Sequence, residues 1–322
     1  MPLVVGVDEA GYGPLLGPLV VGATCWQVEP RRLEQDFWSL LRACVVRPPK
    51  RRDTHLTVGD SKQVYDPKQG LATLERGVLA FASATGKRCD SVSTFLAGLD
   101  SRAAELPCTP GMPWYRELDE RLPVAGARAG FAGIARRLRA AMDGAGLRCC
   151  GLAARVVTED FFNQRLAVTR SKAAVLQEQV LSLLHEAARQ AGEQDMLVRI
   201  DRLGGRCNYR ELLRTAFPER HLHELEVGDT LSRYRLASAR SDWFIEFSVA
   251  ADRRHLPVSL ASMIAKYVRE LLMLRFNRFW RRLLPTLRPT AGYYKDARRF
   301  LVDIRPALPQ AGIAPTAFVR AR

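Results

Sequence analysis

Four acids stand where apolar runs of the sequence end, and their type and position suggest a common chemistry. Asp8 and Glu9 follow the run LVVGV, Asp201 closes LVRI and Asp252 follows SVAA. An unpaired charge beside a buried strand is costly, so acids at these places need compensation. If the strand ends meet at one edge of a mixed sheet, the four carboxylates repel one another and require divalent cations. Clustered carboxylate oxygens are typical ligands of Mg²⁺ or Mn²⁺.

A pair of such cations about 4 Å apart activates a water and stabilises a leaving oxygen in phosphodiester hydrolysis. The sequence therefore predicts that Asp8, Glu9, Asp201 and Asp252 form a catalytic two-metal site. A second interpretation treats each acid separately, because an Asp after a strand commonly serves a turn or caps a helix. The spacing of the acids leaves both interpretations open. The glycines that follow Glu9 would allow a nucleic-acid backbone to approach closely.

Hydrophobic periodicity predicts the elements that must hold these acids. LVVGVDEAG and PLVVGATCW form two strands around a Gly-rich bend, which favours an antiparallel hairpin. Ser259 is typical of the N-cap of a long helix that ends near Leu284. The other expected elements are helices over 131–142 and 172–190 and strands over 196–201 and 243–252. The pattern indicates an α/β fold with a central mixed sheet flanked by helices.

We divide the chain into a catalytic domain over 1–258, with an insertion around 85–155, and a basic helical region over 259–322. Between Lys266 and Arg299 ten Lys or Arg stand against two acids, a net charge of +8. Arg275, Arg278, Arg281 and Arg282 are expected to track phosphates and complete the substrate groove. The alternative is an ordinary amphipathic helix with a solvated basic face.

Composition limits the class of protein. The 322 residues are 47% hydrophobic, enough for a large folded domain, and the formal charge of +15 favours a polyanionic partner such as nucleic acid. Seven cysteines without a CxxC pair indicate a reducing compartment and no structural zinc. The uncharged stretch 10–28 contains prolines and glycines, so it is interpreted as strand–turn–strand rather than a membrane span. No secretory signal is recognised, and we expect a cytoplasmic monomer.

Several motifs together resemble the ribonuclease HII family. DEAGYGPLLGPLVVGA resembles the DEAGRGP-type segment that supplies the family's first two metal-binding acids, and GDSK (59–62) resembles its DSK motif. RIDRLGG stands in the place of the third acid. AADRRHLPVSLASMIAKYVRE resembles the segment in which the fourth acid precedes an ASIxAKxxRD element, and GYYK (292–295) resembles a late Gly-Tyr motif.

The resemblance implies an RNase H-like fold and endonucleolytic cleavage of the RNA strand of an RNA–DNA hybrid or a ribonucleotide-containing duplex. It implies Mg²⁺ or Mn²⁺ held by the four acids. It also implies glycine contacts with the ribose 2′-hydroxyl, which distinguishes RNA from DNA. The residues that it assigns to nucleic-acid binding are Gly11, Tyr12, Gly13, Ser61, Lys62, Ser262, Lys266 and Tyr293.

The sequence departs from the family pattern at three places. Tyr12 replaces the usual Arg, the late motif lacks its His, and the chain is longer than a compact member. Without the charge at position 12, we expect runs of ribonucleotides to be cleaved better than a single one. Two alternatives remain open: a non-catalytic nucleic-acid-binding protein that keeps the fold, and a nuclease for another structured nucleic acid.

Overall fold

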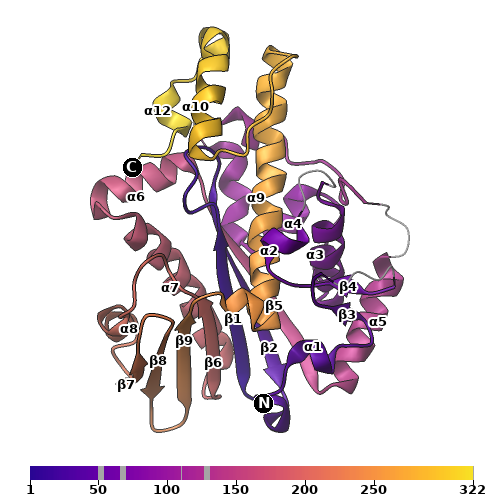
Figure 1. Ribbon diagram of the computed structural model, residues 1–322, viewed down its shortest axis with the longest axis vertical. Helices are drawn as coiled ribbons and strands as arrows, with labels where there is room; N and C mark the ends of the chain where they lie inside the picture. The colour runs from indigo at the N-terminus through magenta and orange to yellow at the C-terminus, as the bar shows by residue number, and fades with distance from the viewer. Residues whose placement is uncertain (50–53, 66–69, 110, 127–130, 322) are drawn as a thin grey trace.

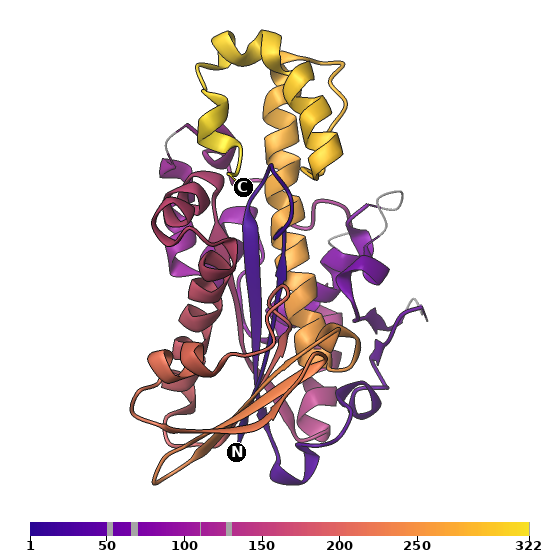
Figure 2. The same cartoon turned by 60° about the vertical axis from the view of Figure 1, so that its left-hand side comes forward.

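A seven-stranded sheet runs through the computed structural model, which describes residues 1–49, 54–65, 70–109, 111–126 and 131–321 (Figures 1 and 2). Its strand order is β5-β2-β1-β6-β9-β8-β7. The strands are β1 (Leu3–Ala10), β2 (Leu19–Val28), β5 (Leu147–Val157), β6 (Met196–Asp201), β7 (His221–Val227), β8 (Leu231–Ala237) and β9 (Asp242–Ser248). Two short strands, β3 (Val45–Val46) and β4 (Leu56–Thr57), pair separately.

The central strands run in both directions. β1 and β2 form the predicted antiparallel hairpin, and β5 extends it in antiparallel fashion. β1, β6 and β9 are mutually parallel, so their carboxyl ends lie at the same edge of the sheet. β7 and β8 continue the sheet as an antiparallel hairpin beyond β9. The expected mixed sheet is therefore confirmed.

Helices cover both faces of this sheet. The α-helices are α1 (Phe37–Leu40), α2 (Ser61–Val64), α3 (Ala72–Ala84), α4 (Val92–Leu99), α5 (Phe131–Gly144), α6 (Glu159–Thr169), α7 (Lys172–Ala191), α8 (Arg210–Ala216), α9 (Leu256–Leu283), α10 (Tyr294–Asp303), α11 (Leu308–Ala311) and α12 (Pro315–Phe318). The 3₁₀ turns are η1 (Pro30–Arg32), η2 (Ser101–Cys108), η3 (Pro113–Tyr115), η4 (Ala251–Arg253) and η5 (Arg305–Ala307). The helices predicted over 131–142 and 172–190 are confirmed as α5 and α7.

Each face of the sheet has its own apolar core. Val4 points into the core that contains α3, α4, α5 and α9, whereas Val5 and Val7 point into the core that contains α7 and α8. The alternation follows from the period-2 direction of side chains along a strand. It also places the two adjacent acids, Asp8 and Glu9, on opposite sides of β1.

α9 lies unusually close to the hairpin because two glycines leave room for it. A Cβ at Gly6 would stand 2.2 Å from the carbonyl carbon of Pro257, and one at Gly22 would stand 2.3 Å from the carbonyl oxygen of Ala261. Both contacts are with the backbone of α9, which cannot move aside as a flexible side chain can. These two glycines therefore fix the distance between helix and sheet.

Two predicted boundaries are wrong. Ser259 is not the N-cap of α9, which begins after His255; its hydroxyl instead donates to the backbone carbonyls of Asp252 and His255. The strand predicted over 243–252 ends at Ser248. Ala250 has a φ of 54°, so the chain turns there and Asp252 lies in η4. The helix thus begins earlier than predicted, whereas the strand ends earlier because a turn replaces its last residues.

The proposed domain limits fall inside packed elements. The limit at residue 258 lies within α9, whose residues Leu260 and Ile264 share a core with Val4. The segment expected to be an insertion, 85–155, contains α4, η2, η3, α5 and most of the edge strand β5. Within that segment, residues 110 and 127–130 lie outside the described part of the chain. Among the described residues, none of the helices combines the length and the apolar character needed to cross a bilayer.

Candidate active site

The structure brings three strand ends and their acids to one edge of the sheet. β1 and β6 pair in parallel with Val7 opposite Ile200, so Asp8 and Asp201 follow at neighbouring positions. Asp252 is brought in by η4, where the amide of Ala251 donates to Asp201 Oδ1 at 2.8 Å. The predicted convergence of these elements is thus what the topology produces.

The environment of Asp8 and Glu9 disfavours their negative charge. Burial, followed by the charges of Glu9 and Asp201, raises the pKa of Asp8 well above its ordinary value. Burial, followed by the charge of Asp201, raises the pKa of Glu9 to about 7. Each carboxylate therefore experiences the others as like charges in a poorly solvated place.

The remaining two acids show the same effect. Burial raises the pKa of Asp252 to about 6, and the charges of Asp60 and Asp201 add to the shift. Burial also raises the pKa of Asp201, although the hydrogen bond from Ala251 opposes it. The four predicted acids form one interacting electrostatic group.

Lys62 is the basic side chain that acts most widely on this group. It is exposed on α2, and its charge lowers the pKa values of Glu9, Asp201 and Asp252. The short helix is held by Asp60, whose carboxylate accepts from the Lys62 amide at 2.9 Å. The GDSK turn therefore presents a lysine to the acids.

Asp60 is a fifth acid that the sequence analysis did not assign to the site. It is 4% exposed, its charge raises the pKa values of Asp252 and Asp201, and it forms an ion pair with Arg253 at 3.1 Å. Its position before Ser61 marks it as a helix cap in the sequence, and this structural role conceals its proximity to the other acids.

The donor chemistry of the site fits a hard divalent cation. Glu9 Oε2 is buried and has no hydrogen-bond partner in the described chain, which leaves an oxygen available to a ligand. All the side chains concerned offer carboxylate oxygens, the donors that Mg²⁺ and Mn²⁺ prefer. Within the described residues, no three His, Cys, Asp or Glu side chains already stand as a ready-made set of metal ligands. The fit therefore rests on the donor type, the uncompensated charge and the unpartnered Glu9 oxygen.

Residues 11–18, between β1 and β2, form the glycine loop. Two of its glycines are packed tightly against other parts of the protein. Gly11 has a φ of 89°, and a Cβ there would stand 2.5 Å from Arg269 Nε and 2.6 Å from the Pro18 carbonyl oxygen. At Gly17 a Cβ would stand 2.2 Å from the Met273 sulfur. By contrast, Gly13 is exposed and a Cβ there would meet no atom within 4 Å. Of these three glycines, only Gly13 has the open surroundings expected for close approach by a nucleic acid.

Four more residues were predicted to bind nucleic acid, and two of them lie beside the acids. Ser61 and Ser262 lie beside the acids: their hydroxyls are hydrogen-bonded to each other at 3.0 Å, and a hydrogen bond from Ser262 lowers the pKa of Asp8. Lys266 is engaged elsewhere, in an ion pair with Glu270 at 2.7 Å. Tyr293 is 52% exposed at the start of α10.

The arginines of α9 are less available than the sequence suggested. Arg275 and Arg278 both pair with Glu120, at 3.1 and 3.0 Å, and Arg282 pairs with Glu117 at 3.2 Å. The acids come from the segment after η3, which the sequence analysis treated as part of an insertion. A large share of the positive charge on this helix is therefore compensated within the protein.

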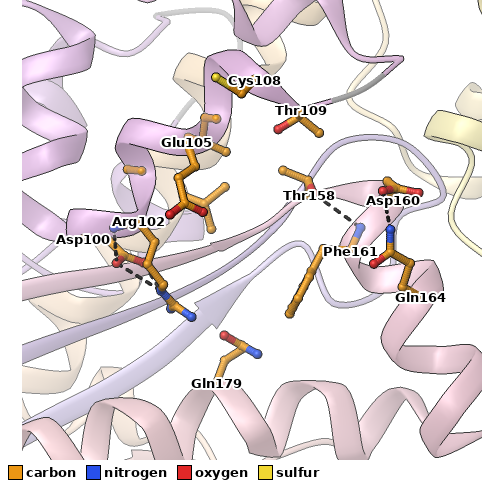
Figure 3. Close-up of a pocket in the computed structure, with 13 residues that line it drawn as sticks. Asp100, Arg102, Glu105, Cys108, Thr109, Thr158, Asp160, Phe161, Gln164 and Gln179 are labelled. Carbon is orange, nitrogen blue, oxygen red and sulfur yellow. Dashed lines mark hydrogen bonds and ion pairs between the residues drawn. The ribbon is translucent and has the colours of Figure 1, made fainter.

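A cavity of the surface lies apart from the acid group. Figure 3 shows a cavity of about 450 Å³ between η2 and the helices α6 and α7, lined by Asp100, Arg102, Glu105, Asp160 and Gln179 among others. None of the four predicted acids lines it. The candidate site lies instead where the carboxyl ends of β1 and β6 meet, apart from the residues that line this cavity.

Comparison with known proteins yields structural neighbours alone: no family model and no curated protein matches the chain. The chain is similar to RNase HII of Archaeoglobus fulgidus in its complex with PCNA, with 17% identity over 99% of this chain and 94% of that one and a TM-score of 0.42. It is similar to ribonuclease H2 of Pyrococcus horikoshii OT3, with 15% identity, coverages of 98% and 92% and a TM-score of 0.42. Bst-RNase HIII in complex with Mn²⁺ matches with 13% identity, coverages of 94% and 62% and a TM-score of 0.38. Since these TM-scores lie below 0.5, the function proposed next rests on the site itself.

Proposed function

We propose that this protein is a divalent-metal-dependent endoribonuclease that hydrolyses the RNA strand of RNA–DNA hybrids or ribonucleotide-containing duplexes. The observation that carries the proposal is the group of four acids at one sheet edge: burial raises all four pKa values, and the charges of other acids in the group further raise those of Asp8, Glu9 and Asp252. Such a cluster of carboxylates is energetically costly without cations. Its presence therefore favours a function that requires cations at this place.

Asp8, Glu9, Asp201 and Asp252 would hold the cations. The chemistry that bound Mg²⁺ or Mn²⁺ supplies is activation of a water and stabilisation of the leaving oxygen of a phosphodiester. The chain's own contribution is orientation: the Ala251 amide fixes the Asp201 carboxylate, and Ser262 supports Asp8. Lys62 is placed to attract the phosphate backbone towards the acids.

The test is the Asp201→Asn variant with Asp143→Asn, an exposed residue of α5, as its matched control. Asparagine keeps an oxygen that accepts from the Ala251 amide, so the fold is retained while the metal loses an anionic ligand. We expect Asp201→Asn to bind an RNA–DNA hybrid but to cleave it slower by orders of magnitude, and Asp143→Asn to behave as the wild type. Wild-type cleavage by Asp201→Asn would remove the proposed site.

One observation favours a second candidate, a non-catalytic nucleic-acid-binding protein: no three acids of the described chain already form a ligand set. Titration with Mn²⁺ by calorimetry separates the two, because a binding module gains nothing from a cation at its own acids. A panel of labelled duplexes, including all-DNA and branched substrates, separates the ribonuclease from a nuclease for another structure. Cleavage confined to strands that contain ribonucleotides supports the function proposed here.

A further inference from the structure

Arg320, which the sequence analysis did not single out, lies buried beneath the glycine loop. It is 2% exposed, and its guanidinium donates hydrogen bonds to the carbonyl oxygens of Gly11 and, at 2.9 Å, of Tyr12. Its backbone amide donates to the carbonyl of Leu15 at 2.9 Å. One residue therefore contacts the loop at three points, although more than 300 positions separate it from the loop in the sequence.

The segment around Arg320 is itself fixed by α6. The Asn163 side chain donates to the Val319 carbonyl at 2.9 Å and accepts from the Ala321 amide at 2.7 Å, so it holds the chain on both sides of Arg320. The guanidinium also lies over the Phe162 ring, 4.0 Å from its centroid. Figures 1 and 2 both show the end of the chain beside the top of the β1–β2 hairpin. Arg320 thus connects the glycine loop to a rigid helix.

Stability alone does not explain this arrangement. Arg320 Nε and Glu159 Oε1 are buried without hydrogen-bond partners in the described chain, which is costly for charged groups. Burial lowers the pKa of Arg320 to about 10, while the charge of Glu159 opposes the shift, so the guanidinium stays protonated at neutral pH. A partly satisfied buried charge of this kind is typical of a residue kept for its effect on a site.

The hydrogen bonds of Arg320 determine which way the loop amides face. In a trans peptide the C=O and the following N–H point in opposite directions. With the carbonyls of Gly11 and Tyr12 turned inward to the guanidinium, the amides of Tyr12 and Gly13 are turned outward. Gly13 is exposed and unobstructed, so that side of the loop is accessible to a ligand. Two successive outward amides form a small concavity that binds oxygen atoms.

We propose that Arg320 is a positioning residue that orients the Tyr12 and Gly13 amides towards the 2′-hydroxyl of a bound ribonucleotide. The inference rests on the proposed ribonuclease function and deepens it by naming the device that would set its preference for RNA. Arg320 acts through the loop backbone, whereas Asp8, Glu9, Asp201 and Asp252 hold the cations.

The test compares Arg320→Gln with Arg305→Gln, which removes the same charge from an exposed position in the same region. Affinity for a ribonucleotide-containing duplex and for the same duplex in DNA is measured in the Asp201→Asn background, which prevents cleavage. Because two charge-assisted hydrogen bonds are lost, we expect Arg320→Gln to reduce the preference for the ribonucleotide by about tenfold. Affinity for the DNA duplex should change by less than about twofold, the size of effect expected at a surface site. Calorimetric affinity for Mn²⁺, measured with Asp201 intact, should be unchanged by Arg320→Gln. Arg320→Lys should restore part of the preference, since an ammonium still donates to a carbonyl.

Asn163→Ala provides a second approach without any change of charge. It releases the segment on both sides of Arg320, so we expect the same loss of preference to a smaller degree. Added to Arg320→Gln, it should have little further effect, because both changes act on one contact. If Arg320→Gln does not fold, Asn163→Ala and Arg320→Lys carry the comparison.

The outcomes separate the inference from the function on which it rests. A ribonucleotide preference in Arg320→Gln equal to that in Arg305→Gln overturns the inference. Equal losses on RNA-containing and DNA duplexes also overturn it, since they indicate a general phosphate contact. If the wild-type protein shows neither cleavage nor preference, the proposed function fails, and hydrogen exchange then decides the structural part. The Leu15 and Leu16 amides donate to the Gly292 carbonyl. They should exchange faster in Arg320→Gln than in the wild type, and no faster in Arg305→Gln. Unchanged exchange rules out control of the loop by Arg320.

Discussion

Glu9 combines a pKa of about 7 with a buried carboxylate oxygen that has no hydrogen-bond partner in the described chain. Folding raises this pKa above the ordinary value of 4.5, so the folded state binds more protons than the unfolded state between these values. The contribution of Glu9 to stability therefore becomes less favourable as pH rises from about 4.5 to 7. Above that window the charged, metal-free carboxylate costs about 3 kcal/mol.

Glu9→Gln should accordingly raise the melting temperature of the metal-free protein by a few degrees at pH 8, and by less at pH 5. Added Mn²⁺ should stabilise the wild type at pH 8 more than the variant, because the variant has lost a ligand. Thermal denaturation with chelator and with Mn²⁺ measures both effects. Glu226→Gln, an exposed position on β7, serves as control. An equal gain for Glu9→Gln at both pH values would mean that Glu9 is not buried as a charge.

Gly13→Ala tests the open side of the glycine loop. No atom lies within 4 Å of the added Cβ and the φ of Gly13 is outside the left-handed region, so stability should be unchanged. If a nucleic acid lies against this residue, the methyl group obstructs it and KM for an RNA–DNA hybrid should rise several-fold. Steady-state kinetics together with a melting curve make the comparison. Unchanged KM with an unchanged melting curve would place the substrate elsewhere.

The acids were predictable at this scale because charge is rare at the end of an apolar run. Asp60 and Arg320 were not, for different reasons. Asp60 stands in a polar turn, where a helix cap explains it fully. Arg320 stands in a short basic segment without a motif, and its partners are backbone carbonyls, which no sequence pattern specifies.

At the scale of elements, α9 and the β1–β2 hairpin form the support of the site. Gly6→Ala should destabilise the fold by about 3 kcal/mol or more, since the new Cβ meets the α9 backbone at 2.2 Å. Urea denaturation measures the loss, with Gly133→Ala in α5 as control because a Cβ there meets no atom within 4 Å. The control should lose no stability, since Ala is favoured over Gly in a helix. An equally harmless Gly6→Ala would show that α9 can shift away from the sheet.

The regular interiors of elements were predictable and their ends were less so. β6 and α7 follow directly from apolar periodicity, and Gly192 is the C-cap of α7. The predicted start of α9 is wrong because the Ser259 hydroxyl does not accept from amides later in the chain, as an N-cap would. It donates to the carbonyls of two earlier residues, Asp252 and His255. β9 was extended too far because the turn at Ala250 requires a positive φ that Ala seldom adopts.

At the scale of the whole molecule, the formal charge of +15 overstates the charge that a polyanion meets on α9. Arg278 shares Glu120 with Arg275, whereas Arg281 is exposed and forms no ion pair in the described chain. Arg281→Gln should lower the slope of log K against log salt by up to about 0.9, the value for one phosphate contact. Arg278→Gln should lower it less. Fluorescence anisotropy with duplex DNA across a salt series distinguishes the two variants, and equal slopes would contradict the difference in pairing.

The length of α9 determines how far from the acids its last arginines could contact a bound duplex. Ser262 stands beside the acids and Arg281 stands 19 positions later on the same helix, a rise of about 28 Å. Base pairs are spaced about 3.4 Å apart, so a straight duplex laid along the helix would reach Arg281 about eight base pairs beyond the scissile position. Gly6 and Gly22 allow the helix to pack directly on the sheet. The distance along α9 from the acids to Arg281 is therefore fixed. Under the proposed function, a hybrid that extends less than about eight base pairs beyond the acids would not reach Arg281.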